Sequence, residues 1–203
     1  LGGTLDLQGS TWNLNAATGS WSLLGGTVKN GTITETAGAL LIATNSGGVL
    51  TGITVNGDLD VSRSNNSNIR IYGGLVLNGS LLIGDAASTT YGRVYFGDSS
   101  TAPGSLTGTG TVVFGGSTFN FIQNSSNLTG ASGTFTIGPN ITVRGKNGTI
   151  YNTFNNGSLV NQGTISADTA GGTIIVGGDG TSAFTNTGTI NVQNGGRLNV
   201  PVS

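Results

Sequence analysis

Residues 159–167 read LVNQGTISA and residues 184–192 read FTNTGTINV, so one pattern recurs at a period of about 25 residues. In both copies the first, seventh and ninth places are apolar, and Gly-Thr precedes the seventh. A second pair of phrases, GTIIV at 172–176 and GRLNV at 196–200, has almost the same separation. Self-similarity at such a period is the signature of a solenoid, in which each repeat stacks on its neighbours.

The same spacing, in steps of about 22–25 residues, extends toward the N-terminus. Three series of apolar residues follow it: Leu198, Ile174, Ile150, Leu128 and Leu106; Ile190, Ile165, Ile141 and Phe119; and Phe184, Leu159, Phe135 and Val112. A sandwich or meander barrel has strands at short intervals too, but does not require matching positions at this longer period. The spacing therefore favours a parallel β-helix, whose matching residues form ladders about 4.8 Å apart.

Two-residue alternation of apolar and polar residues defines the strands within each repeat. Examples are Leu59/Val61, Leu75/Leu77 and Phe119/Phe121, and Asn-Gly and Gly-Gly turn pairs separate such segments. We predict an all-β, right-handed, single-stranded parallel β-helix with three short strands per coil. About 22–25 residues per coil give roughly eight or nine coils, and residues 1–203 form one domain. The right-handed winding is expected because parallel crossover connections nearly always take that hand.

The composition excludes most chemistry based on side chains. The 203 residues include 38 Gly, 30 Thr, 22 Asn and 20 Ser, and only 7% are charged, against a usual value of roughly 25%. Because His and Cys are absent, a Ser-His-Asp triad, a Cys/His zinc site and a disulfide are impossible. Seven scattered Lys and Arg residues argue against nucleic-acid binding. No apolar run approaches the length of a membrane span.

The run from residue 159 to residue 200 resembles the β-helical repeats of bacterial autotransporter passenger domains and filamentous-haemagglutinin-like adhesins. The resemblance extends over the chain in style, is strongest after Phe135, and includes no catalytic motif. It implies a secreted or surface-displayed bacterial protein. The chain begins at Leu1 without Met, which predicts a processed product or a fragment of a longer protein.

The candidate ligand contact is formed by Arg70, Tyr72, Arg93 and Tyr95. The phrases Arg70-Ile71-Tyr72 and Arg93-Val94-Tyr95 are separated by one repeat, so we expect Arg to stack on Arg and Tyr on Tyr. Outward guanidinium and phenol groups suit a glycan or a partner surface. The alternative is a tyrosine ladder that stiffens this face. Asp85 and Asp98, in nearby loops, would balance the charge.

Two acidic features are weaker candidates. Asp58 and Asp60 alternate with Leu59 and Val61, so both carboxylates should face outward, where they form either a solvated face or part of a cation or catalytic site. One coil later the matching residues are Ser80 and Leu82, which add no further charge. Residues 177–180 read GGDG, like the start of a calcium-binding nonapeptide, but the phrase occurs once and predicts a turn.

These observations predict a non-enzymatic extracellular structural or adhesive β-helix, a surface-displayed or filament-forming segment of a bacterial adhesin or matrix protein. We expect no catalytic residue, cofactor or metal site. Expected partners are a second copy stacked head to tail, the rest of a longer chain, or a host or environmental glycan. The alternative function is a carbohydrate-binding or polysaccharide-degrading β-helix, which would need charged groups gathered on neighbouring coils.

Overall fold

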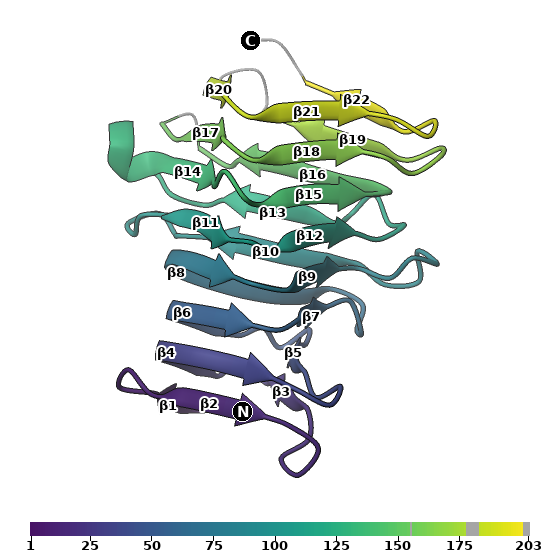
Figure 1. The fold of residues 1–203 in the computed structure, drawn as a ribbon. Helices are drawn as coiled ribbons and strands as arrows, with labels where there is room; N and C mark the ends of the chain where they lie inside the picture. Colours follow the sequence, from purple (N-terminus) through teal and green to yellow (C-terminus); the bar gives the residue numbers. More distant parts are fainter. Residues whose placement is uncertain (155, 178–182, 201–203) are drawn as a thin grey trace.

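The protein is a parallel β-solenoid of eight coils, with a last strand that begins a further turn (Figure 1). A computed structural model describes residues 1–154, 156–177 and 183–200. Within these residues the structure has 22 strands and one short 3₁₀ helix, Gly130–Gly133. The predicted all-β fold and three strand segments per coil are confirmed. The predicted turn at residues 177–180 lies almost wholly outside the described residues.

Each coil contributes one strand segment to each of three faces. The first face holds β1 (Thr4–Asp6), the starts of β4 (Thr27–Glu35), β6 (Val49–Asn56) and β8 (Ser67–Leu77), then β10 (Gly92–Phe96), β13 (Phe121–Asn124), β16 (Asn147–Asn152), β19 (Thr173–Val176) and β22 (Arg197–Asn199). The second face holds β2 (Thr11–Leu14), the ends of β4, β6 and β8, then β11 (Ser105–Gly108), β14 (Thr134–Ile137), β17 (Ser158–Asn161) and β20 (Ala183–Asn186). The third face holds β3 (Trp21–Leu23), β5 (Leu41–Ala43), β7 (Leu59–Val61), β9 (Ser80–Ile83), β12 (Thr111–Phe114), β15 (Thr142–Gly145), β18 (Thr164–Ala167) and β21 (Thr189–Val192).

The first and second faces belong to one 14-stranded sheet because β4, β6 and β8 run through both faces. β8 pairs with β10 through its first half and with β11 through its second half, and both pairings are parallel. Between the halves the chain bends at Gly73 and Gly74. Gly74 has φ of +96°, and a Cβ there would lie 2.6 Å from the carbonyl oxygen of Ser105 in the next coil. Glycine at this bend therefore permits both the turn and the close stacking.

Aliphatic ladders fill the interior of the solenoid. On the third face Leu59, Leu81, Val112, Val143 and Ile165 are successive partners and are fully buried. Like residues stack on like because strand neighbours in parallel register hold equivalent positions about 4.8 Å apart. Stacking covers both sides of each inner coil, so the core is one continuous cluster along the solenoid.

The predicted spacing gives correct strand partners only in the C-terminal half of the chain. The pairs found as expected are Leu198 with Ile174, Ile190 with Ile165, Phe184 with Leu159, and Leu159 with Phe135. Other steps are wrong; Ile150, for example, pairs with Ile122 rather than with Leu128. Loops of different size interrupt the strands, so coil length varies along the solenoid. In a short coil, Leu41 pairs with Leu59. In a much longer coil, Thr111 pairs with Thr142.

Phe119, the N-terminal member of one predicted series, does not belong to the core. Phe119 lies in a loop and is 64% exposed, whereas the alternation Phe119/Phe121 predicts that both rings face the core. In β13 the buried residues are Ile122 and Asn124, and Phe121 faces outward. Among the described residues, no helix is long and apolar enough to cross a membrane.

Candidate functional site: an aromatic and arginine strip on the first face

The four predicted contact residues lie on the first face, but in a different register. Arg70 is the strand partner of Tyr95 rather than of Arg93, and Arg93 is the partner of Asn68. The predicted stacking of Arg on Arg and Tyr on Tyr is therefore wrong. The loop between β9 and β10 makes this coil longer than the spacing of the two phrases suggests, which shifts every pair on this strand. Arginine consequently lies beside tyrosine, and the two types of side chain interact.

Arg70 and Tyr72 are held by the adjoining loop. The Arg70 guanidinium carbon lies 4.9 Å from the centre of the Tyr95 ring, and its Nη1 donates a 2.6 Å hydrogen bond to the carbonyl of Gly97. Burial raises the pKa of Tyr72, and the interaction of its hydroxyl with the Asp98 carboxylate raises it further. The backbone amide of Ser100 holds the pKa of Asp98 well below its usual range. Arg70 and Tyr72 therefore already interact with the loop that follows β10.

Arg93 lies between two aromatic rings. Its guanidinium carbon is 5.0 Å from the centre of the Tyr91 ring and 5.3 Å from that of Phe121. A cation over ring faces at this range is stabilised by the ring quadrupoles. The Arg93 Nε is buried without a hydrogen-bond partner. Within the described part of the chain, the Arg93 guanidinium has neither a hydrogen bond nor an ion pair.

The rings continue along the solenoid axis from coil to coil. Tyr95 and Phe121 meet edge to face with centroids 5.3 Å apart, and Phe121 meets Tyr151 in the same way at 5.5 Å. We call this group the aromatic–arginine strip, and its members are Arg70, Tyr91, Arg93, Tyr95, Phe121 and Tyr151. The Tyr151 hydroxyl donates to the Gln123 side chain at 2.5 Å. Burial raises the pKa of Tyr151, and the nearby Arg93 charge opposes that shift.

Sequence reasoning missed Tyr91, Phe121 and Tyr151, which are half of the strip. Phe121 joins it because β13 pairs with β10 in a register that makes Phe121 the partner of Arg93, and β16 then brings Tyr151 beside Gln123. Phe119 touches the edge of the strip, with its centroid 5.6 Å from that of Tyr91. The sequence feature that could have placed Phe121 is the alternation Ile122/Asn124. These two residues continue the buried ladder of Val94 and Phe96, so Phe121, between them and the preceding turn, faces outward.

The acidic candidates are structural in this fold. Asp60 is only 3% exposed, forms a 2.6 Å ion pair with Arg63, and accepts hydrogen bonds from the amide and hydroxyl of Ser62. The expectation of two solvated carboxylates is therefore wrong for Asp60. Asp58 accepts a 2.7 Å bond from the amide of Ser80 in the next coil. Among the described residues no group of three or more acidic side chains could hold a metal ion.

Asp85 also serves its own loop rather than the strip. Its carboxylate accepts hydrogen bonds from the backbone amides of Thr89 and Thr90 and from the Thr89 hydroxyl. The Thr89 hydroxyl bond is the largest of the effects that lower the pKa of Asp85. In the described residues neither Asp85 nor Asp98 forms an ion pair with Arg70 or Arg93. The predicted balancing charges are thus not paired with the arginines.

Glu35 joins two coils at the corner between the second and third faces. Its carboxylate accepts a 2.7 Å bond from the amide of Leu41 and a 2.6 Å bond from the amide of Asp58 in the next coil. Burial raises the pKa of Glu35 to about 7, and the two amides oppose this shift without cancelling it. Asp58 repeats the arrangement one coil later with Ser80.

We expect stability to fall as pH rises from 5 to 8 because of Glu35. Its pKa is raised on folding, so folding favours the protonated form, and its contribution is complete below pH 4.5 and lost as pH passes about 7. The side chain is only half-buried, so we expect about 1–2 kcal/mol rather than the roughly 3 kcal/mol of a fully buried group. The chain has no His to titrate in this range. Urea unfolding of wild type and Glu35→Gln at several pH values checks this expectation. The free energy of unfolding of the variant should not fall between pH 5 and 8, and an equal pH dependence in both proteins would contradict the assignment to Glu35.

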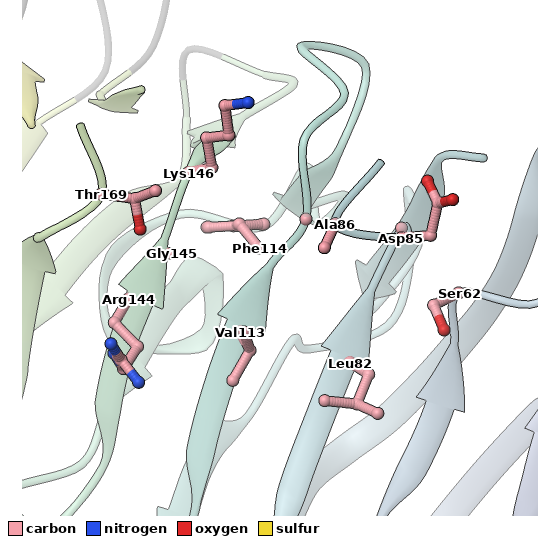
Figure 2. A pocket seen from close by; sticks show the side chains of 12 residues that line it. Ser62, Leu82, Asp85, Ala86, Val113, Phe114, Arg144, Gly145, Lys146 and Thr169 are labelled. Carbon is pink, nitrogen blue, oxygen red and sulfur yellow. The ribbon is translucent and has the colours of Figure 1, made fainter. Parts of the chain in front are cut away.

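A separate groove lies on the third face (Figure 2). It has a volume of about 610 Å³, with Leu82 and Val113 projecting from the neighbouring strands β9 and β12. Arg144, on β15, lines it too, but its Nε is paired with Asp168 at 2.6 Å. Lys146 at the rim forms no ion pair within the described residues. The groove therefore offers a mainly apolar floor and one unpaired cation.

Fold and site together define the chain as a parallel β-solenoid with a strip of aromatic and arginine side chains along one face. Comparison of the chain with protein families, curated proteins and solved structures gives no match.

Proposed function

We propose that this chain is a non-enzymatic structural and adhesive solenoid, a secreted or surface-displayed segment of a bacterial adhesin or matrix protein. The observation that carries the proposal is the aromatic–arginine strip on the first face. Its half-buried side chains lie on or directly beside the neighbouring strands β8, β10, β13 and β16, whose pairing fixes their positions. Rigid display of aromatic and arginine groups is typical of contact surfaces.

The composition and the repeats support the same function. The resemblance of residues 159–200 to autotransporter and filamentous-haemagglutinin repeats favours export and display at the cell surface. A surface rich in Thr, Asn, Ser and Gly with little charge suits a stalk or matrix component rather than an electrostatically steered enzyme. Head-to-tail stacking of copies would extend such a stalk into a filament, since a heterologous contact that does not close generates one.

Surface labelling tests this proposal. Antibodies raised against the purified chain should label intact cells of the source organism, and brief protease treatment of those cells should remove the label. Labelling that requires permeabilised cells would contradict surface display. Electron microscopy of the purified chain over a range of concentrations tests self-association: filaments that lengthen with concentration support stacking, and uniform short particles at every concentration contradict it.

A further inference from the structure

Arg93 differs from the three Lys and Arg residues that form ion pairs within the described residues. Lys29, Arg63 and Arg144 each form an ion pair with an aspartate, at 3.2, 2.6 and 2.6 Å. Arg93 is instead fixed between the rings of Tyr91 and Phe121, with no carboxylate partner among the described residues. A guanidinium that is already oriented loses little side-chain entropy when it binds, and its planar fork matches a carboxylate. Within the described residues, the Arg93 guanidinium is thus held in place without an anionic partner.

A groove begins at Phe121, the strand partner of Arg93 on the next coil, and runs along the solenoid axis. Its first part, about 340 Å³, is lined by Phe121 and Tyr151 of the strip together with Thr149 and Ile175. A second part of about 290 Å³ shares Thr149 and Ile175 with the first and reaches Thr173 of β19. Register pairing of Phe121, Thr149 and Ile175 places these residues on three successive coils. The groove thus crosses the coils rather than following one strand.

Its lining combines ring surfaces with hydroxyl groups. Phe121 and Tyr151 provide partly exposed rings, while Thr118 and Thr149 provide hydroxyls that donate and accept hydrogen bonds. Pyranose sugars need this mixture, because their C–H faces pack on aromatic rings and their hydroxyls need polar partners. A sugar unit is also close in length to the coil repeat of about 4.8 Å, so a linear glycan on the axis would present equivalent groups to successive coils.

We propose that this groove binds an acidic glycan chain lengthwise, with a sugar carboxylate on Arg93 and sugar rings against Phe121 and Tyr151. The inference rests on the proposed adhesive function and names the class of its ligand. Arg93 supplies the charge, the two rings supply the stacking surface, and Thr149 supplies a hydroxyl beside them. Arg70 contributes less, because its Nη1 is already bonded to Gly97.

Affinity electrophoresis and calorimetry with defined polysaccharides test the proposal. The whole chain should bind polygalacturonate and should not bind dextran, which lacks the carboxylate. Arg93→Gln should weaken binding to polygalacturonate about tenfold or more, since charge-assisted hydrogen bonds are among the stronger polar contacts. The matched control is Lys146→Gln, which removes one unpaired positive charge from the third-face groove and should bind like wild type.

Arg93→Lys is a second variant, which keeps the test valid if Arg93→Gln fails to fold. It keeps the charge and the aliphatic stem but loses the planar fork, so it should fold and bind several-fold more weakly than wild type. Equal loss in Arg93→Gln and Lys146→Gln would overturn the assignment in favour of nonspecific charge attraction. Binding of dextran as tight as polygalacturonate, Arg93-dependent binding of dextran sulfate instead of polygalacturonate, or no binding of any of the three would overturn it as well. Surface labelling of intact cells is independent of these results, so failure here is distinguishable from failure of the proposed function.

Discussion

Phe96→Ala should cost about 3–5 kcal/mol in the free energy of unfolding. Phe96 is fully buried on β10, and its ring centroid lies 4.3 Å from that of Phe135 on the second face. The substitution leaves a cavity between coils whose strands are fixed by pairing to both neighbours, so collapse cannot refill it. Urea unfolding followed by far-ultraviolet circular dichroism measures the loss.

The matched control is Phe119→Ala. Phe119 is the same residue type but is 64% exposed, so we expect a change within about 0.5 kcal/mol. A small effect at Phe96, or equal effects at the two positions, would contradict a core that is packed across the first and second faces. In a solenoid each coil contacts only its neighbours, so the Phe96 cavity should also lower cooperativity and broaden the transition.

Asn120→Ala should cost about 2–5 kcal/mol because it leaves hydrogen-bonding groups of two other coils without their partner. Asn120 is fully buried before β13, where its Oδ1 accepts a 3.0 Å bond from the amide of Gly92 and its Nδ2 donates a 3.2 Å bond to the carbonyl of Asn147. These bonds join three successive coils at one corner. Each buried polar group left unsatisfied costs about 1–3 kcal/mol.

Thermal and urea unfolding of Asn120→Ala against Asn140→Ala check this expectation. Asn140 is an exposed turn residue, so its substitution should change the unfolding free energy by no more than about 0.5 kcal/mol. If Asn120→Ala is as stable as the control, buried asparagines do not hold the corners together. Asn147 repeats the arrangement, since its side chain bonds Gly116 on one side and Thr173 on the other.

The fold class could be predicted from sequence because alternation and turn residues are local signals. Leu59/Val61 and Leu75/Leu77 are buried as the alternation predicts. The offset between coils was not predictable to the same degree, because it depends on loop lengths that no strand pattern encodes. The phrase repeated at Leu159 and Phe184 predicted the correct pair, and it did so because the coils there are nearly equal in length.

The candidate site was predictable only in part for the same reason. Arg70, Arg93 and Tyr95 were placed correctly on an outward face, but their neighbours follow from the register. The observed strand register adds Phe121 and Tyr151 to the strip. Tyr72 is not part of it and interacts with Asp98 instead. The burial of Asp60 was missed because the cover is supplied by Arg63, which lies in the turn after β7 and belongs to no repeat.

Disulfide trapping tests the register on which the strip depends. The natural chain has no Cys, so an introduced pair has no competing thiols. Arg70→Cys with Tyr95→Cys joins strand partners, whose Cα spacing of about 5 Å suits a disulfide. Tyr72→Cys with Tyr95→Cys is the pair that the sequence spacing suggests, and it lies out of register in the structure. We predict an intramolecular disulfide in the first variant and free thiols in the second under the same oxidation; the reverse result would contradict the structure and the strip derived from it.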